Sequence, residues 1–355
     1  MRKGRILPVF AALSLLFSLF VSPPARSAEG EEGDFSFASI LSETRVGGWI
    51  DLLYHDSDRK GEERGFDLHH VYLFVDSQVN ERWRVFAEVE FEHAPHLEDG
   101  ESKGELKLER GYAEHFRSDL LKFRFGKFNT PFGIWTPTHW AVYVDTVRKP
   151  IHEDNKYVPP KSVGVEAFGA WFPRLFSLPL QVEWALFLSN GGEYEGTDNR
   201  EDGKLGGGFD VRARVADDYL LGLSGYGRNE ETPSDGTAGR NERSLMLYGE
   251  ASLPWSFLVR AEALLQDRSR GDRSLDAWYG KVRWDFRDDA YVNVRYESGD
   301  DEKRAGGGRH RVTTLTLGYW VAPEVRLKGE VSFHDFKDPG KEDYSEWVAW
   351  LGVIF

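Results

Sequence analysis

The chain has 355 residues, with 45 basic and 59 acidic side chains, a formal net charge of −14 and no cysteine. The lack of cysteine excludes a disulfide framework, a cysteine zinc site, a thiol nucleophile and covalent attachment of a c-type haem. The acidic balance argues against nucleic acid as a partner, because phosphate binding requires a basic face. The composition also contains 12 tryptophans, and aromatic residues make up 14% of the chain.

The first 27 residues have the three regions of a secretory signal peptide. Basic residues occur among the first five positions, residues 6–21 are apolar, and small residues precede a cleavage point expected near Ser27. A retained membrane anchor is the alternative, but the apolar stretch is short for a spanning helix. Cleavage leaves 41 basic and 59 acidic residues, a net charge of −18, and a short periplasmic segment at 28–43. No later stretch is apolar for the 20 or so residues that a membrane helix needs.

From residue 44 onward, apolar and polar residues alternate, which predicts half-buried β-strands. In the stretch "WRVFAEVEF", for example, Val85 and Val89 lie on one face and Arg84 and Glu88 on the other. Each strand has about ten residues, the length that a tilted strand needs to cross a bilayer. We expect sixteen strands, at 44–56, 66–77, 82–93, 105–117, 121–129, 162–172, 179–189, 206–217, 219–229, 242–253, 256–267, 274–286, 289–299, 309–321, 324–336 and 345–355.

The connections between these strands alternate between short turns and long polar loops. This alternation is typical of a bacterial outer-membrane barrel, with short turns on the periplasmic rim and long loops outside. The long loops are expected near 57–65, 94–104, 130–161, 190–205, 230–241, 268–273, 300–308 and 337–344.

The predicted fold class is therefore all-β, a 16-stranded antiparallel transmembrane β-barrel that forms a single domain over 44–355. A soluble sandwich is the alternative, but its strands are usually shorter, and sixteen strands must close or expose an edge. In hydrocarbon, closure alone satisfies every backbone group of a sheet. Aromatic residues near strand ends suit an interfacial girdle: Trp49, Trp83, Trp171, Trp255, Trp278, Tyr319 and Trp347.

Two strands raise specific questions. The stretch 345–355 alternates apolar residues to its end at Phe355, and we expect it to pair with the first strand to close the barrel. In "LKLERGYAEHF", the apolar parity places Arg110 and Glu114 towards lipid, where charge is costly. A bulge near Gly111, or a subunit interface over that face, would remove this conflict.

The third long loop, 130–161, is the longest, and it mixes apolar residues with charges. A sixteen-stranded barrel encloses a wide aqueous channel unless something narrows it. We expect this loop to fold into the lumen, although packing on the rim or on a neighbouring subunit is the alternative. The residues expected at the constriction are Asp145, Arg148, Lys149, His152, Glu153, Asp154 and Lys156.

The charged parity of the strands is expected to line the lumen. Fixed charges of this kind set ion selectivity in pores, although they can also pair across neighbouring strands and only hydrate the wall. Both possibilities stay open for this set: Arg84, Glu88, Glu90, Lys107, Glu109, Lys122, Arg124, Arg212, Arg214, Arg260, Arg283, Arg295, Arg326 and Lys328.

We expect no enzyme activity, cofactor or metal site. The sequence contains no nucleophile elbow, zinc-protease motif or phosphate-binding glycine loop. His69 and His70 are adjacent strand residues, which should point to opposite faces and so cannot share one metal ion. A further group in a loop suits solvation better than weak binding of a divalent ion: Glu92, His93, His96, Glu98 and Asp99.

The segment "FGKFNTPFG" resembles the strand-to-loop junction of porins of the phosphate-selective O and P type, and of general Gram-negative porins. The residues that carry this likeness are Gly126, Phe128, Pro131, Phe132 and Gly133. A terminal strand ending in Phe355 is similar to the signal that outer-membrane assembly machinery reads.

The resemblance implies an outer-membrane porin, usually trimeric, for passive diffusion of small hydrophilic solutes or ions. The phosphate-selective members carry a ladder of lysines, whereas this chain has 15 lysines against 30 arginines and no ladder can be mapped onto it. The alternatives are a substrate-specific anion or phosphate porin, or a structural barrel that sheathes a partner such as an electron carrier.

Overall fold

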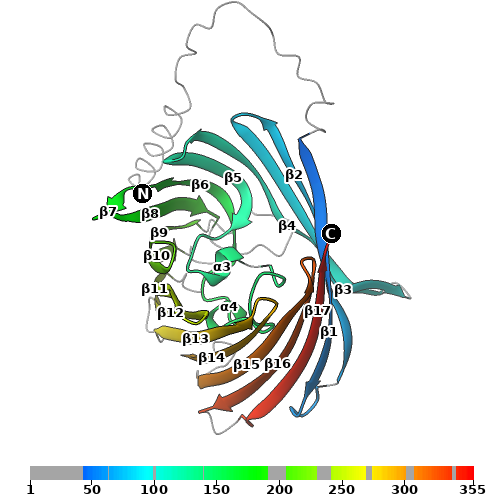
Figure 1. The fold of residues 1–355 in the computed structure, drawn as a ribbon. Helices are drawn as coiled ribbons and strands as arrows, with labels where there is room; N and C mark the ends of the chain where they lie inside the picture. Colours follow the sequence, from blue (N-terminus) through cyan, green and yellow to red (C-terminus); the bar gives the residue numbers. More distant parts are fainter. Residues whose placement is uncertain are drawn as a thin grey trace, which may run out of the picture. The chain divides into compact units, whose positions relative to one another are not determined.

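Sixteen long strands close into one antiparallel barrel in the computed structural model (Figure 1). The structure describes residues 43–62, 64–98, 101–138, 140–190, 205–229, 241–268, 274–300, 308–337 and 341–355. The expected signal peptide, and the segment after it as far as residue 42, lie outside these described residues.

The strands follow one another around the barrel in chain order, and each is antiparallel to its neighbours. Their bounds are β1 Thr44–Ser57, β2 Gly65–Asn80, β3 Trp83–Glu98, β4 Glu101–Ser118, β5 Leu121–Asn129, β6 Lys161–Trp171, β7 Arg174–Leu175, β8 Leu178–Ser189, β9 Leu205–Val215, β10 Tyr219–Asn229, β11 Asn241–Leu253, β12 Phe257–Arg268, β13 Leu275–Arg287, β14 Ala290–Asp300, β15 Arg309–Ala322, β16 Val325–Phe336 and β17 Tyr344–Ile354. Two four-residue helices, α3 (Trp135–Thr138) and α4 (Ile151–Asp154), lie between β5 and β6.

The last strand pairs with the first and closes the barrel. Trp49 lies opposite Ile354, and the ladder runs to Ser57 opposite Glu346. At its end, the Gly48 amide donates to the Phe355 carbonyl at 2.9 Å, and the Phe355 amide donates to the Gly48 carbonyl at 3.0 Å. The predicted closed 16-stranded antiparallel barrel is thus confirmed.

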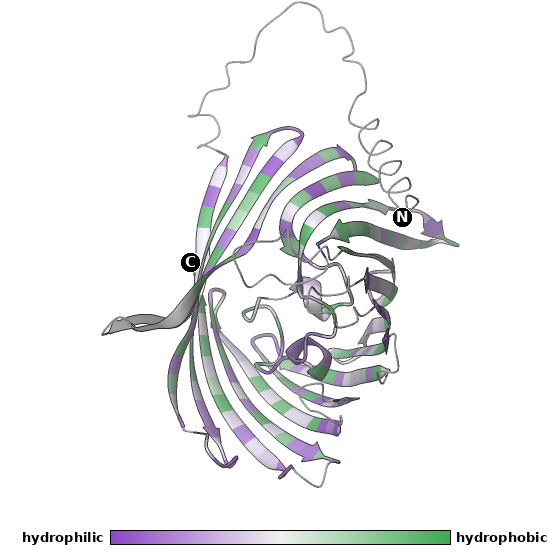
Figure 2. Ribbon diagram, turned by 180° about the vertical axis from the view of Figure 1, so that it is seen from behind, coloured by the Kyte–Doolittle hydropathy of each residue, from purple (hydrophilic) through white to green (hydrophobic). Residues whose placement is uncertain are grey.

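The two faces of the sheet reverse the pattern of a soluble protein. Large apolar side chains on the outer face are exposed, such as Leu247 at 56% and Leu265 at 64%, whereas charged side chains on the inner face are buried, such as Glu262 at 2% and Arg295 at 0%. Figure 2 shows hydrophobic and hydrophilic residues alternating along the strands. An outer face of this kind is suited to lipid. None of the helices in the described ranges is long and apolar enough to cross a membrane.

Three local predictions were wrong. The expected long loop at 94–104 is largely strand, because β3 and β4 pair as far as Glu98 opposite Glu101. The short turn after β6 contains a two-residue strand, β7, which pairs with the start of β8. Trp49 does not belong to an outer girdle, because it is 1% exposed and stacks on Tyr72, with ring centroids 4.4 Å apart.

A bulge in β4 resolves the conflict at Arg110 and Glu114. Arg110 lies opposite Glu88, but the next pair is Leu108 with Val89, so Glu109 is the extra residue. The insertion reverses the alternation of faces along the strand. Arg110 and Glu114 therefore face inward, where Arg110 pairs with Glu88 at 2.6 Å.

Closure depends on close approach of the backbones at Gly48. A Cβ atom at this position would lie 2.2 Å from the Tyr72 carbonyl oxygen and 2.8 Å from the Phe355 ring. A Cβ atom at Gly280 would meet no other atom within 4 Å. Gly48→Ala is therefore expected to cost about 1–3 kcal/mol through overpacking, and Gly280→Ala is the matched control.

The measurement is the fraction of refolded barrel that shows heat-modifiable migration in electrophoresis. Gly48→Ala should lower this fraction and the midpoint of thermal unfolding, while Gly280→Ala should leave both unchanged. Equal behaviour of the two variants would contradict the importance of this contact for closure.

Candidate functional site

The loop between β5 and β6 lies inside the barrel, and two apolar clusters attach it to the wall. At its base, Phe132 and Tyr157 pack with Met246 and Leu264 from β11 and β12. Further along, Val142 packs with aromatic residues of β1, β2 and β17. Figure 1 shows α3 and α4 within the ring of strands. We call this segment, residues 130–160, the lumenal loop.

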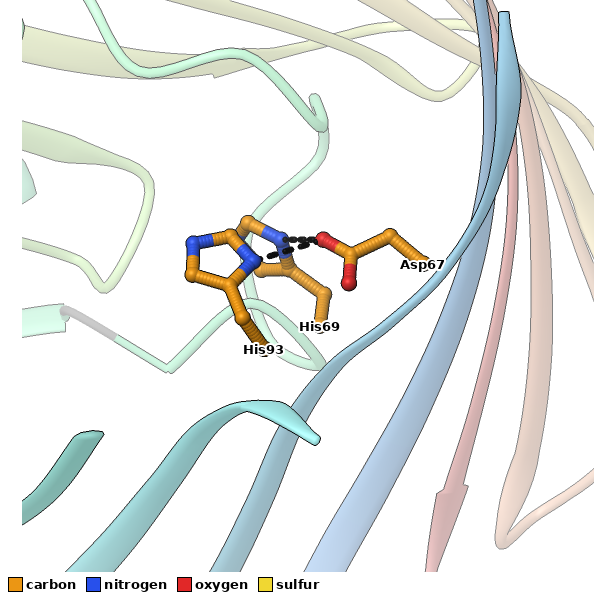
Figure 3. A group of neighbouring side chains, drawn as sticks. All are labelled: Asp67, His69 and His93. Carbon is orange, nitrogen blue, oxygen red and sulfur yellow. Dashed lines mark hydrogen bonds and ion pairs between the residues drawn. The ribbon is translucent and has the colours of Figure 1, made fainter. Parts of the chain in front are cut away.

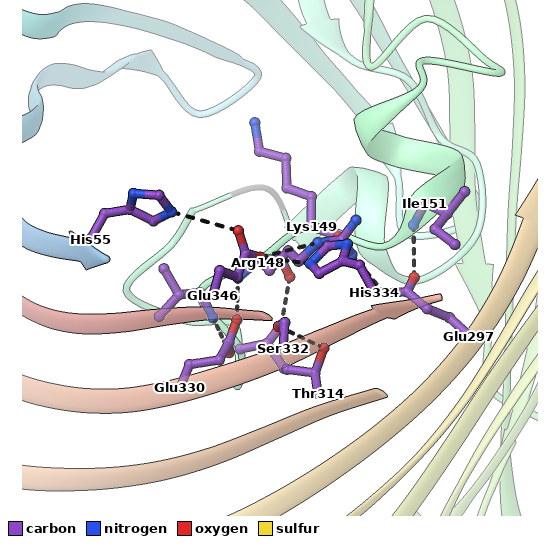
Figure 4. A network of polar contacts seen from close by, with 12 residues as sticks. His55, Arg148, Lys149, Ile151, Glu297, Thr314, Glu330, Ser332, His334 and Glu346 are labelled. Atoms are coloured by element: carbon purple, nitrogen blue, oxygen red, sulfur yellow. Dashed lines mark hydrogen bonds and ion pairs between the residues drawn. The ribbon is translucent and has the colours of Figure 1, made fainter. Parts of the chain in front are cut away.

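Carboxylates of the wall accept hydrogen bonds from the backbone of the lumenal loop. Glu330 on β16 accepts from the Val147 and Arg148 amides at 2.7 and 2.8 Å. Glu297 on β14 accepts from the Ile151 amide at 2.7 Å (Figure 4). Glu262 on β12 accepts from the amides of residues 134 and 135. These carboxylates take the place of the partners that a helix or sheet would supply to these amides.

Cationic side chains of the wall donate to carbonyl groups of the same loop. Arg326 donates to the Val142 carbonyl at 2.7 Å, and Lys328 donates to the Ala141 carbonyl at 2.6 Å. Arg295 donates to the Arg148 carbonyl at 3.0 Å. Three of the residues expected along the lumen wall therefore act as backbone anchors for the loop. Side chains of the surrounding strands therefore pair with both amide and carbonyl groups of the loop backbone.

Asp145 is the most strongly paired charge of the lumenal loop. Its carboxylate contacts Lys281 and accepts from Arg283 at 2.8 Å, and Arg326 lies 3.8 Å away. Burial by itself opposes ionisation, but the charges of Lys281 and Arg283 hold the pKa of the Asp145 carboxyl well below its usual range. Asp145 therefore stays ionised throughout the physiological pH range, at the centre of three cations.

Arg148 and His152 are also held by acidic residues of the wall. Arg148 donates to Glu297 at 2.6 Å and lies 3.5 Å from Glu346. The His152 ring is buried, with Nε2 3.4 Å from Glu262. Burial by itself lowers the pKa of His152, but the nearby carboxylate of Glu262 outweighs this effect and raises that pKa above its usual value.

The other predicted constriction residues differ in exposure. Glu153 accepts from the Thr136 hydroxyl, and its burial raises the pKa of its carboxyl. Lys149, Asp154 and Lys156 have exposed side chains. The predicted set therefore divides into three residues that contact the wall, one that bonds within the loop, and three whose side chains reach solvent.

The sequence motif at the start of the lumenal loop has a steric explanation. Gly126 has φ +128°, and a Cβ atom there would lie 2.2 Å from the Gly111 carbonyl oxygen. Gly133 has φ +69°, and a Cβ atom would lie 2.7 Å from Glu262. Positive φ angles of this kind favour glycine. Phe128, Pro131 and Phe132 are buried around this turn, which directs the chain into the lumen.

On the opposite side of the barrel, charged residues pair along neighbouring strands. Arg84 on β3 bonds Asp76 on β2 at 2.7 Å and lies 3.7 Å from Glu114 on β4. Arg124 on β5 bonds Glu114 at 2.9 Å and Glu166 on β6 at 2.6 Å. Acid and base thus alternate over five consecutive strands. We call this row, Asp76–Arg84–Glu114–Arg124–Glu166, the charged belt.

The remaining predicted wall residues also face inward, and most contact a side chain of the opposite type, acidic with basic. These contacts are Glu88 with Arg110, Glu90 with His70, Lys107 with Glu92, Glu109 with Lys161, Arg212 with Asp210, Arg214 with Glu250, Arg260 with Glu250, and Arg283 with Asp285 in addition to Asp145. Lys122 differs, because its ammonium lies over the rings of Phe116 and Phe168, with no carboxylate within 4 Å among the described residues.

A cavity of about 380 Å³ lies between the first turn of the lumenal loop and the wall of β4 to β9. Its loop side is formed by Pro131 and Pro137, next to Asn129 at the end of β5. The charged residues that line it are Arg110, Lys122, Arg124, Glu166, Glu183, Asp210 and Arg212. Ordered charges on one side and a fixed loop on the other make this cavity the candidate passage through the barrel.

Sequence reasoning did not predict which inward residues hold the lumenal loop, and it did not name four of them as site residues. Glu262, Lys281, Glu297 and Glu330 all have the inward parity of their strands, and this parity was the signal that placed them in the lumen. Their partners are backbone groups or a loop carboxylate more than 100 positions away in the sequence. Alternation along a strand carries no information about such contacts.

No family model matches the chain. An uncharacterized protein of Aquifex aeolicus (strain VF5) is 30% identical in an alignment 353 residues long. The alignment covers 86% of this chain and 79% of that protein.

Three solved structures share the fold at low sequence identity. The anion-selective porin from Comamonas acidovorans has a TM-score of 0.63 and 10% identity, over 88% of this chain and 99% of that one. The outer membrane channel DcaP of Acinetobacter baumannii has a TM-score of 0.61 and 9% identity, over 88% and 97%. In-vitro folded OmpT of Vibrio cholerae, in its trimer form, has a TM-score of 0.59 and 13% identity, over 88% and 99%.

Asp145→Asn tests the attachment of the lumenal loop. The variant leaves Lys281 and Arg283 without their shared counter-charge, and removal of one partner of a buried pair costs about 3 kcal/mol or more. We expect a lower midpoint of thermal unfolding and additional closing events in single-channel recordings. Asp288→Asn is the matched control, because it makes the same change at an exposed position in the turn between β13 and β14. Equal behaviour of the two variants would contradict the role of Asp145.

His152→Gln tests the pH dependence of the same attachment. Because the folded pKa of His152 is raised, its charge stabilises the fold fully below pH about 6.5, and this stabilisation is lost as pH rises through the raised value. Thermal midpoints measured from pH 6 to pH 9 should fall more steeply for the wild type than for His152→Gln. Identical slopes for the wild type and His152→Gln would show that His152 makes no such contribution.

Proposed function

The chain belongs to the same family as the uncharacterized Aquifex aeolicus protein, and we propose that it forms a water-filled outer-membrane channel for small hydrophilic solutes or ions. The observation that carries this proposal is the division of the lumen by the lumenal loop. The backbone of the loop is hydrogen-bonded to side chains of β12, β14 and β16, and a charge-lined cavity lies between the base of the loop and the wall of β4 to β9. Such a partly filled barrel has the layout of a porin, in which a loop narrows a wide channel.

The outer surface supports placement in a membrane. The outward side chains of the strands are large, apolar and exposed, as at Leu247 and Leu265. Several of the aromatic residues expected in a girdle are exposed as well, including Trp171 at 59%, Trp255 at 83% and Trp347 at 57%. An apolar band with aromatic borders is typical of outer-membrane barrels.

Selection in this channel would depend on size and charge and would not require tight binding. Four cations and three acids line the cavity, and most of them are paired with one another. Paired charges hydrate a wall while they leave only a small net field. Lys122 is the exception, because it presents a positive charge to the cavity without a carboxylate within 4 Å in the described part of the chain. We therefore propose modest selectivity, with Lys122 favouring anions.

Two alternative functions have less support. A barrel that sheathes a partner protein needs an empty lumen, whereas the lumenal loop of this chain is attached to the wall at many points. A phosphate-specific channel needs several lysines along the path, whereas Lys122 is the single lysine of the cavity lining. Trimeric assembly and recognition of Phe355 by assembly machinery follow from the porin resemblance and stay predictions.

The proposal is tested by single-channel recording of the detergent-refolded protein in a planar bilayer. Stable open steps that recur at one conductance would support the channel, and steps in groups of three would support a trimer. Absence of conductance from a correctly folded, heat-modifiable barrel would overturn the proposal.

Lys122→Gln is expected to change the ion preference of the channel. Loss of the unpaired charge should shift the reversal potential under a tenfold salt gradient towards cation preference, by several millivolts. Lys60→Gln removes the same charge from an exposed position, paired with Glu342 at 2.6 Å, and should leave the potential unchanged. Equal potentials for both variants and the wild type would show that the cavity does not lie on the conduction path.

A further inference from the structure

A group of metal-binding side chains lies at the end of β2 and β3 that is nearest the long loops. Asp67 and His69 come from β2, and His93 comes from β3. Figure 3 shows the three side chains pointing towards one another. One carboxylate oxygen, Asp67 Oδ2, lies 3.0 Å from His69 Nδ1 and 2.8 Å from His93 Nδ1. All three donor atoms lie within 4.8 Å of one another.

Two backbone irregularities bring these residues together. In β2, Asp51 of β1 pairs with His70 and the next pair is Leu52 with Leu68, so His69 is the extra residue of a bulge. This bulge overturns the sequence expectation that His69 and His70 point to opposite faces. Their rings lie on the same side, with centroids 3.8 Å apart.

In β3, His93 has φ +56°, in the left-handed region that few residues other than glycine adopt. His93 is the first residue at which the pairing of β3 with β4 is interrupted, between Glu92 and His96. Backbone strain of this kind is costly and clusters at functional sites. The bulge in β2 and the strain in β3 occur at the two histidines that approach the same Asp67 oxygen.

Two residues next to this group extend the set of donors. His69, His70 and Glu92 form a second group whose donor atoms also lie within 4.8 Å of one another. Asp51 holds the His70 ring at 3.1 Å, and Lys107 holds the Glu92 carboxylate at 2.7 Å. Orienting contacts of this kind are typical of the residues that surround metal ligands.

The donor chemistry selects the class of ion. Two imidazole nitrogens and a carboxylate oxygen suit Zn²⁺ and its neighbours Ni²⁺ and Cu²⁺, whereas Mg²⁺ and Ca²⁺ prefer sites made of oxygen alone. Zn²⁺ binds histidine nitrogen and carboxylate oxygen at about 2.0–2.2 Å, so its ligands lie about 3.3 Å apart in a tetrahedral site. The two distances to Asp67 Oδ2 are close to this spacing. The side chain of His93 is 53% exposed, which leaves a route for an ion to enter.

We propose that Asp67, His69 and His93 form a binding site for Zn²⁺ or a similar divalent transition-metal ion in the mouth of the barrel. A bound ion would replace the two hydrogen bonds that now converge on Asp67 and would join β2 to β3 above the regular ladder. The site does not depend on whether the barrel conducts, because binding is measured on the folded chain itself. The competing explanation is that the two histidines serve only as hydrogen-bond donors to Asp67.

The test is isothermal titration of the detergent-folded full chain with ZnCl₂, with folding checked by heat-modifiable migration. We expect about one ion per chain. His69→Ala and His93→Ala should each weaken binding by at least about tenfold. Asp67→Asn, which conserves shape, should also weaken it. His115→Ala is the matched control, because it removes one histidine beside Trp83 at the other end of the barrel.

The outcomes separate the two explanations. Weakening in the three cluster variants, together with unchanged binding in His115→Ala, would support the site. No zinc binding by the folded wild type, or binding that both histidine variants retain in full, would overturn it. Asp67→Asn keeps the test decisive if a histidine variant fails to fold, because its side chain differs from aspartate only in charge and in one donor group.

Discussion

Backbone amides and carbonyls that leave regular secondary structure inside a barrel must find partners there. The lumenal loop has 31 positions between β5 and β6 and only two four-residue helices, so most of its peptide groups cannot bond to one another. Unpaired peptide groups in a buried setting are costly. Strands β12, β14 and β16 reduce this cost, because their carboxylates accept from loop amides and their cations donate to loop carbonyls.

This constraint divides the charges of the lumen into two sets. On the side that contacts the loop, Glu297, Glu330, Arg326 and Lys328 are occupied by peptide groups of the loop. On the side of the charged belt, acids and bases pair along neighbouring strands. The first set fixes the position of the loop, and the second keeps the facing wall hydrated and nearly neutral. The passage that we propose lies between them.

The sequence predicted the barrel, its sixteen strands, its closure and a long third loop, because a period of two and alternating connection lengths are local signals. The same period of two predicted that residues such as Arg124 and Arg295 face the lumen. It failed at Arg110 and Glu114, because the extra residue Glu109 reverses the parity of the residues that follow it. It also failed at His69, where an extra residue turns two neighbours to one face. Bulges depend on the pairing of two strands, so the sequence of one strand does not reveal them.

The partners of the charged residues were also beyond sequence reasoning. Asp145 was expected in the constriction, but its three cations come from β13 and β16, more than 100 residues further along the chain. Such contacts decide whether the charges of the wall create an electric field across the channel or pair with one another across neighbouring strands. The structure shows local pairing for most of the wall and backbone anchoring for the rest, with Lys122 as the exception among the described residues.

The most direct test of this account is the single-channel conductance of a variant in which residues 134–157 are replaced by a short glycine–serine linker. If the loop is fixed inside the barrel and divides the lumen, the shortened variant should fold and conduct several times more current than the wild type at the same salt concentration. An unchanged conductance in a folded, heat-modifiable variant would show that the lumenal loop does not set the width of the channel, and would contradict the account.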